Sequence, residues 1–179
     1  MPARSAPEMV KVWDGPLRTL HWALAFFVLL AWFSSGKNDG LHRFAGYTVI
    51  GLIAFRIVWG LFGTRYSRFR ALGRRLRAAP AYLLSLHQGR SGRYRGLNPA
   101  GTSMMVAMLL LLAVSTATGW MSTTVRFFGV PWVEDTHGYV SGAVIVLVVV
   151  HVLGVLATCV LQRENLVRAM ITGRKRRRR

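Results

Sequence analysis

The sequence predicts an all-α integral membrane protein, a bundle of four transmembrane helices with both termini in the cytoplasm. Three observations support this fold class. Of the 179 residues, 53% are hydrophobic, and the mean hydropathy is +0.35. The apolar residues gather in four blocks, each about as long as the roughly 20 residues that cross a bilayer. The chain holds 24 Lys and Arg against six Asp and Glu, and almost all the basic residues lie outside the blocks.

The first apolar block spans residues 16–35. Asp14 is expected to cap this helix, and Pro16 to lie in its first turn, where a missing N–H costs little. The first dozen residues lack the apolar core of a signal peptide and are expected to form an exposed arm. The turn residues of the loop SGKNDG predict a tight hairpin that leads into the second block, residues 41–63.

A basic connection, residues 64–99, follows the second block and cannot lie in lipid. Its stretch RALGRRLRAAPAYLLSLHQG predicts one or two short amphipathic helices at the lipid headgroups. A third block, residues 101–121, and a fourth, residues 136–161, complete the pattern before a basic tail, residues 162–179. We expect residues 1–179 to form a single membrane domain.

The distribution of basic residues predicts the orientation, because loops retained in the cytoplasm carry an excess of Lys and Arg. Both termini and the 64–99 connection are basic and are expected inside the cell. The RKRRRR run at the end of the chain is expected to contact anionic lipid, and no nucleic-acid partner is expected. The connections between the first and second blocks and between the third and fourth are expected outside the cell. They hold equal numbers of basic residues (Lys37, Arg43 and Arg126) and acidic residues (Asp39, Glu134 and Asp135).

Four histidines are expected inside the bundle at two depths. The stretch HGYVSGAVIVLVVVH separates His137 from His151 by fourteen residues, which places both on about one helix face, about 21 Å apart along the axis. His21 lies near the inner start of the first span, and His42 opens the second span at the outer surface. A lone intramembrane histidine could serve as a helix–helix hydrogen bond. Two pairs matched in depth, His21 with His151 and His42 with His137, argue for a functional site.

Paired imidazoles of this kind have the arrangement of axial ligands on the two sides of a six-coordinate haem. Zinc or copper normally needs further ligands at the same depth, and the spans offer almost none. The absence of a Glu-x-x-His motif excludes a di-iron carboxylate site, and the single cysteine, Cys159, excludes covalent haem attachment. Five glycines in the spans either leave room for a porphyrin or simply let helices approach: Gly46, Gly51, Gly138, Gly142 and Gly154.

Several motifs together resemble the prokaryotic cytochrome b561 family, which is related to the b-type cytochrome subunits of nickel–iron hydrogenases. They are VWDGPLRTLHW, LHRFAGY, FRIVWGLFGTRYSRF, the HGYVSG to VVVH helix and RENLVRAMITGRK, and they cover the chain from about Val12 to Lys175. The resemblance implies a four-helix bacterial inner-membrane protein that encloses two non-covalent haems b and passes electrons between a quinone pool and a partner. By position, its haem ligands fall on His21, His42, His137 and His151.

Arg56 is a further candidate site residue. It follows His42 by fourteen residues, so it lies on about the same helix face, at the depth of the inner histidine pair. Because an uncompensated guanidinium is costly in a membrane, we expect Arg56 to contact a haem propionate or a quinone head group. The alternative is that its side chain extends to the cytoplasmic headgroups.

Three roles are open within the resemblance. The chain could be a quinone oxidoreductase that acts alone, for example with ubiquinone and a small oxidant or reductant such as superoxide. It could also anchor a hydrogenase or another periplasmic dehydrogenase, or serve a periplasmic c-type cytochrome. A homodimer is open as well. The alternative from a different class is a non-redox metal transporter or membrane scaffold, but VSGAVIVLVVV offers only one hydroxyl as a polar path between the two depths.

Overall fold

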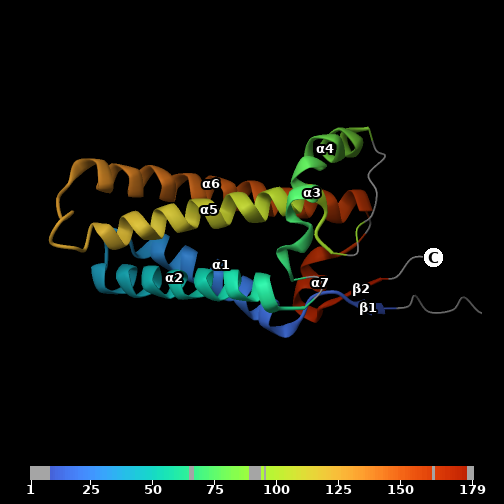
Figure 1. The fold of residues 1–179 in the computed structure, drawn as a ribbon, viewed down its shortest axis with the longest axis horizontal. Coiled ribbons are helices and arrows are strands. Elements are labelled where there is room, and N and C mark those ends of the chain that lie inside the picture. Colours follow the sequence, from blue (N-terminus) through green and yellow to red (C-terminus); the bar gives the residue numbers. More distant parts are fainter. Residues whose placement is uncertain (1–8, 65–66, 89–93, 95, 163, 177–179) are drawn as a thin grey trace, which may run out of the picture.

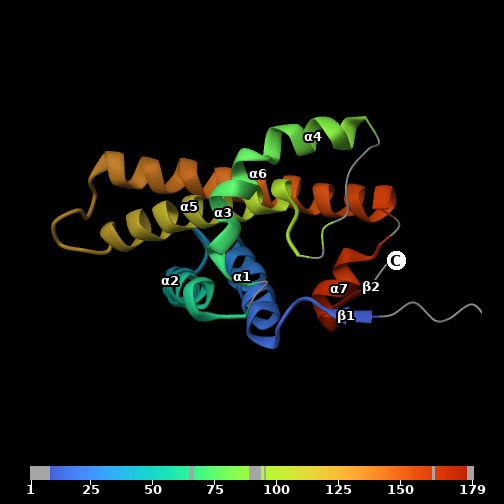
Figure 2. The ribbon, with the colours of Figure 1, turned by 45° about the vertical axis from the view of Figure 1, so that its right-hand side comes forward.

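Four long helices in two layers dominate the computed structural model, which describes residues 9–64, 67–88, 94, 96–162 and 164–176. One layer holds α1 (Gly15–Ser34) and α2 (Asp39–Phe62), and the other holds α5 (Pro99–Met121) and α6 (Pro131–Gln162) (Figure 1). Figure 2 shows that the two layers cross at an angle. All four helices are long and apolar enough to cross a membrane, so the prediction of four spans is confirmed.

Side-chain caps begin three of the four spans. Asp14 accepts a hydrogen bond from the backbone N–H of Leu17 at 2.8 Å, as expected, and Asn38 and Asn98 cap α2 and α5 in the same way. Helix α6 begins at Pro131, five residues before the expected span, because Pro131 suits a first turn and Glu134 complements the helix dipole there. Its 32 residues extend over about 48 Å, more than the hydrocarbon core of a bilayer requires.

The apolar core lies at mid-length, where the two layers meet. Val49 and Ile53 of α2 pack there with Leu112 of α5 and Val144 of α6. Many other large apolar side chains of the spans are exposed on the outside of the bundle, which is typical of a surface that lipid covers. Within this bundle the main helix contacts are α1 with α2 and α5 with α6, and α2 with α5 joins the two layers.

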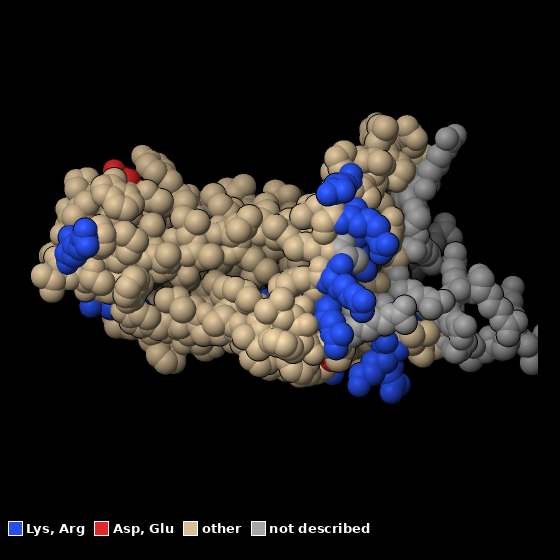
Figure 3. All heavy atoms as spheres, viewed as in Figure 1, with Lys and Arg blue, Asp and Glu red and all other residues tan. Residues whose placement is uncertain are grey.

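The basic connection folds over one end of the bundle. It forms a short 3-10 turn (Phe69–Ala71), then α3 (Leu72–Arg77) and α4 (Ala79–His87), and both helices pack against α5 (Figure 2). The expected short helices are therefore present, while their position at the headgroups stays a prediction. Lys and Arg side chains gather at this end, which we call the basic end (Figure 3). The opposite end, where the α1–α2 and α5–α6 connections lie, is called the hairpin end.

The two termini meet at the basic end in a small sheet that the sequence analysis did not anticipate. Strand β1 (Met9–Lys11) pairs antiparallel with β2 (Arg174–Arg176), directly after α7 (Leu166–Thr172). Met9 and Lys11 are exposed, but Val12 is buried and residues 9–11 form a strand, so a free N-terminal arm is wrong for residues 9–12 and its exposure is wrong for Val12. Residues 1–8 lie outside the described part. The segment is ordered because its backbone finds hydrogen-bond partners in the C-terminal segment.

Gly173 is the residue that allows this junction. It ends α7 at a φ of +77°, and its carbonyl accepts hydrogen bonds from the backbone N–H groups of Val12 and Trp13, at 2.8 and 3.1 Å. A Cβ at this position would lie 2.5 Å from the carbonyl oxygen of Trp13.

We expect Gly173→Ala to destabilise the protein by more than the about 1–2 kcal/mol that a left-handed backbone conformation costs a residue with a Cβ. Gly129→Ala is the matched control, because Gly129 has a φ of +70° and no atom within 4 Å of its would-be Cβ. Thermal unfolding in detergent measures both variants. Equal losses would show that the contact with Trp13 contributes nothing.

Candidate functional site

The structure places the four intramembrane histidines in two pairs, one in each half of the bundle. Toward the hairpin end, His42 of α2 lies beside His137 of α6, with ring centroids 6.0 Å apart and ring planes at 89°. Toward the basic end, His21 of α1 lies beside His151 of α6, with centroids 6.1 Å apart and planes at 63°. Helix α6 therefore contributes one histidine to each pair, and these partners are the ones expected to share a depth.

The hairpin-end pair is oriented by backbone carbonyl groups. His42 Nδ1 lies 2.8 Å from the carbonyl oxygen of Ala31 in α1, and His137 Nδ1 lies 2.8 Å from that of Ser115 in α5. Because a carbonyl oxygen only accepts, each Nδ1 must carry the hydrogen and donate it. Nε2 is then the nitrogen with the free lone pair on both rings. This is the tautomer in which a histidine binds a metal through Nε2.

Gly119 of α5, which the sequence analysis did not single out, lets α5 approach the ring of His137. A Cβ at this position would lie 2.8 Å from Cε1 and 3.0 Å from Nδ1 of that ring. Such contacts are too short for the ring to keep its place. The only signal in the sequence is a small residue within the third span, which cannot by itself indicate the histidine on another helix.

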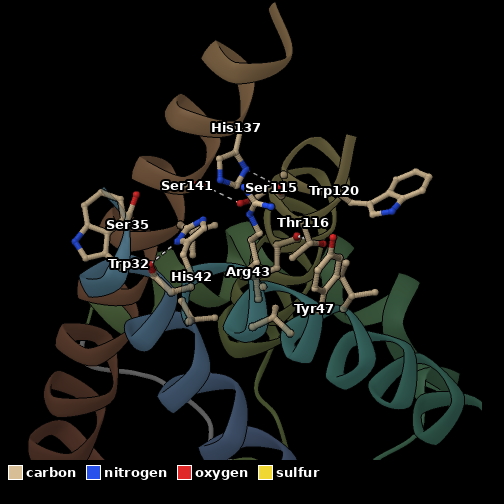
Figure 4. Close-up of a pocket in the computed structure, with 18 of the residues that line it drawn as sticks. Trp32, Ser35, His42, Arg43, Tyr47, Ser115, Thr116, Trp120, His137 and Ser141 are labelled. Atoms are coloured by element: carbon tan, nitrogen blue, oxygen red, sulfur yellow. Dashed lines mark hydrogen bonds between the residues drawn. The ribbon is translucent and has the colours of Figure 1, made fainter. Parts of the chain in front are cut away.

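A cavity of about 320 Å³ adjoins the hairpin-end pair and is lined by all four spans. Figure 4 shows that the side chains of Arg43 and Tyr47 of α2 point into this cavity from the side opposite His137 and Ser141 of α6. The lining includes Gly46 and Gly138, and a Cβ at either would meet no atom within 4 Å. Close helix packing therefore does not explain these two glycines, and room for a porphyrin beside them stays a prediction.

The basic-end pair has different surroundings. Both rings are half-buried, and the edge of His21 lies against Trp22, with ring centroids 5.5 Å apart. Within the described part of the chain, neither His21 nor His151 has a hydrogen bond to another residue. The rings of this pair are therefore held by packing rather than by carbonyl groups.

The geometry of both pairs fits a haem between the rings. A bond of about 2.0 Å from each imidazole to one metal ion places the two ring centroids about 6 Å apart, close to the separations observed. Among the described residues no group of three or more His, Cys, Asp and Glu could hold a metal ion. Each pair thus offers only two imidazoles, a number that suits a metal whose other positions are filled by a macrocycle and not a tetrahedral zinc ion. That the four histidines bind haem stays a prediction.

Arg56 is buried near the basic end of α2, with 6% of its surface exposed. Its guanidinium donates to the carbonyl oxygen of Ser67 at 3.3 Å and to the sulfur of Met105 at 3.1 Å, and it lies 4.6 Å from the ring centroid of Phe69. The side chain does not extend to the surface, in contrast to the headgroup alternative. None of these partners is a carboxylate, and the guanidinium has five N–H donors, so Arg56 can still take a carboxylate or a further carbonyl oxygen. Its contact with a propionate or quinone stays a prediction.

Asp14 has a larger role than the helix cap expected from the sequence. Besides the N–H of Leu17, its carboxylate accepts hydrogen bonds from Nε1 of Trp59 at 3.3 Å and from the hydroxyl groups of Thr64 and Ser67. It thereby joins the start of α1 to the end of α2 and the following loop. Burial raises the pKa of Asp14, but the four hydrogen bonds lower it by more, so the net shift is downward.

We expect Asp14→Ala to destabilise the protein by about 1–3 kcal/mol, because it leaves the buried N–H of Leu17 and the buried hydroxyl of Ser67 without this acceptor. The exposed Asp39→Ala is the matched control and should have a smaller effect.

The lowered pKa means that the carboxylate of the wild type stabilises the fold above the ordinary value of 3.8, and that this stability is lost as the pH falls through the lower folded value. Unfolding curves at several pH values measure the loss of stability in Asp14→Ala and its dependence on pH. If the stability of the wild type and that of Asp14→Ala fall in parallel as the pH is lowered, the carboxylate of Asp14 does not cause the pH dependence.

Comparison with known proteins identifies one family. Residues 12–173 match the family model described as prokaryotic cytochrome b561, which is nearly the whole chain. No curated protein and no solved structure gives a significant match. The family match covers all four spans and all four histidines of the two pairs.

Proposed function

The chain belongs to the prokaryotic cytochrome b561 family, and from this premise we propose that it is a dihaem electron-transfer protein of the bacterial inner membrane. Membership itself makes it a multi-pass membrane protein that binds b-type haem and takes part in electron transfer. Our proposal adds the number of haems, their ligands and the redox partners. His42 and His137 would hold one haem, and His21 and His151 the other.

The observation that carries this proposal is the pair of imidazole separations, 6.0 and 6.1 Å, at two depths along α6. A haem with two imidazole ligands can gain and lose one electron at its iron without a change of ligands. The protein supplies the ligand nitrogens, their orientation and their spacing. Fourteen residues on one helix set the two sites about 21 Å apart along the axis.

Apolar packing separates the two histidine pairs. Val49 lies seven residues after His42, and Val144 lies seven residues after His137, so the core in which both are buried is midway between the sites. These core side chains are apolar and offer no ligand for a metal ion at mid-depth. It supports electron transfer over the alternative of a metal transporter, which would need polar groups along the path.

We propose a quinone, such as ubiquinone, as one redox partner, with both termini and the basic end in the cytoplasm. The charge distribution supports this orientation, because the basic residues concentrate at one end of the bundle (Figure 3). The other partner is a small oxidant or reductant such as superoxide, or else a periplasmic c-type cytochrome or dehydrogenase such as a hydrogenase. Anionic lipid would neutralise the basic end.

Reduction by quinol tests the quinone link and the role of Arg56 together. We expect a soluble ubiquinol analogue to reduce the purified wild-type protein, and Arg56→Leu to slow this reduction at least tenfold, since the leucine removes a buried donor for a carbonyl or carboxylate oxygen. Arg56→Lys should keep part of the rate. Stopped-flow absorbance measures it.

The control is Arg126→Leu, which removes an exposed arginine at the hairpin end. It should leave the rate unchanged. Wild-type rates in Arg56→Leu, together with an unchanged haem content, would assign Arg56 to packing against Ser67, Phe69 and Met105. No reduction of the wild type by quinol would reject the quinone link.

A further inference from the structure

Three arginines line a small cavity at the basic end of the bundle, which we call the notch. They are Arg56 of α2, Arg68 of the loop after α2 and Arg75 of α3, and Thr102 and Met105 of α5 lie opposite in its lining. The volume of the notch is about 10 Å³, which holds about one atom of the size of a water molecule. It therefore admits one oxygen atom of a ligand whose other atoms lie at the surface.

Arg56 forms the buried wall of the notch. Its guanidinium donates to the carbonyl oxygen of Ser67 and to the sulfur of Met105, and the ring of Phe69 lies 4.6 Å from its central carbon. Phe69 packs this close to α2 because residue 60 is glycine, since an added Cβ there would overlap the ring. These contacts fix the guanidinium but use only two of its five N–H donors, so it can also bind an anion.

Arg68 and Arg75 form the outer wall. The Nε of Arg68 donates to the carbonyl oxygen of Gly63 at 2.6 Å, which holds this exposed side chain at the end of α2 and leaves its terminal N–H groups for a ligand. Arg75 is half-buried, and it has no hydrogen bond or ion pair with any residue that the structure describes. A partly buried guanidinium without such a partner favours an anion beside it.

The notch has a net positive charge. No carboxylate of the described residues lines it. The nearest acid along the hydrogen-bond network is Asp14, which accepts from the hydroxyl of Ser67, whose carbonyl oxygen in turn accepts from Arg56. Asp14 offsets one of the three guanidinium charges. The remaining charge and the planar N–H groups suit a phosphate, whose oxygens match the guanidinium geometry.

The place of the notch in the fold favours a lipid phosphate. Arg56, Thr102 and Met105 belong to two of the membrane spans, whereas Arg68 and Arg75 belong to the basic connection. The notch thus lies where the apolar bundle meets the basic end, at the level of the headgroups of the surrounding lipid (Figure 3). Basic pockets between transmembrane helices are typical binding sites for anionic headgroups.

We propose that the notch binds the phosphate of one anionic phospholipid, such as phosphatidylglycerol. One phosphate oxygen contacts Arg56, and the others contact Arg68 and Arg75. Phosphatidylcholine has the same phosphate, but its choline cation is repelled by the arginines. Two of the five donors of Arg56 remain for the propionate or quinone oxygen proposed above. The bound lipid joins α3 to α2 and α5, and its binding does not depend on haem.

Native mass spectrometry of the purified full-length protein in detergent tests the site through the affinity for the first lipid. We expect wild type to bind phosphatidylglycerol about tenfold more tightly than phosphatidylcholine, and Arg68→Gln with Arg75→Gln to remove this difference. Arg75→Gln alone should remove part of it. The matched control is Arg70→Gln with Arg74→Gln, which removes the same charge from exposed positions of the same connection outside the notch. It should bind phosphatidylglycerol like wild type.

Equal losses in the two double variants would overturn the inference, because the attraction would then belong to the whole basic end. If Arg68→Gln with Arg75→Gln does not fold, Arg75→Gln and Arg74→Gln give the same comparison. Inorganic phosphate should not displace the lipid, and displacement at equal concentrations would assign the notch to free phosphate instead. A wild-type protein without haem would reject the proposed function but not this site, so the two failures are distinguishable.

Discussion

His42→Ala is expected to remove one of two haems from the protein, and His21→Ala to remove the other. Each pair offers only two imidazoles, with ring centroids about 6 Å apart, and no described carboxylate or thiolate stands close enough to complete a metal-binding group. Loss of one imidazole would therefore leave a haem with one protein ligand and no replacement nearby. Haem per polypeptide, from pyridine haemochrome spectra, should fall by about half in each variant.

The matched control is His87→Ala. His87 lies at the end of α4, is exposed, and has no histidine partner at its depth. It should retain the full haem content. A double variant, His21→Ala with His42→Ala, should retain none. If His42→Ala and His87→Ala bind equal amounts of haem, the hairpin-end pair is not a ligand pair.

Gly119→Val is expected to disable the hairpin-end site without removing a ligand. The first added carbon atom already lies 2.8 Å from Cε1 of His137, and the β-branched side chain adds two more. The ring must move, and the hydrogen bond from its Nδ1 to the carbonyl oxygen of Ser115 breaks with it. We expect a loss of about half of the haem, or a change of half of it to a high-spin spectrum, with the basic-end site unchanged.

Gly51→Val is the matched control for this substitution. Gly51 lies in the middle of α2, and a Cβ there meets no atom within 4 Å. It should keep two low-spin sites. Gly119→Ala should give an intermediate result, because its single added carbon forces a smaller displacement of the ring. A wild-type spectrum in Gly119→Val would show that the position of His137 does not matter for the site.

The sequence predicted those parts of the fold that depend on local composition. The four spans follow from the length of the apolar blocks, since every backbone polar group must be bonded within its helix in lipid. The depths of the histidines follow from the 3.6-residue period and from the ends of the blocks. His42 and His137, 95 residues apart in the chain, could thus be expected at the same level of the bundle.

Contacts between distant segments could not be predicted in this way. The pairing of β1 with β2 depends on a backbone partner more than 160 residues away, and the RKRRRR run resembles a polybasic tail rather than a strand. Asp14 was identifiable as a cap, but its bonds to Trp59, Thr64 and Ser67 require the tertiary fold. The position of Gly119 beside His137 likewise depends on how α5 packs against α6, which helical period alone does not determine.

The number of b-type haems per polypeptide tests the central claim most directly. It is measured on the purified wild-type protein from a haem-replete host, by reduced-minus-oxidised visible spectra and pyridine haemochrome quantification. We expect two haems b per chain with a low-spin spectrum, one for each histidine pair. A folded protein with one haem would refute the dihaem arrangement, and one with none would return all four histidines to a role in helix packing.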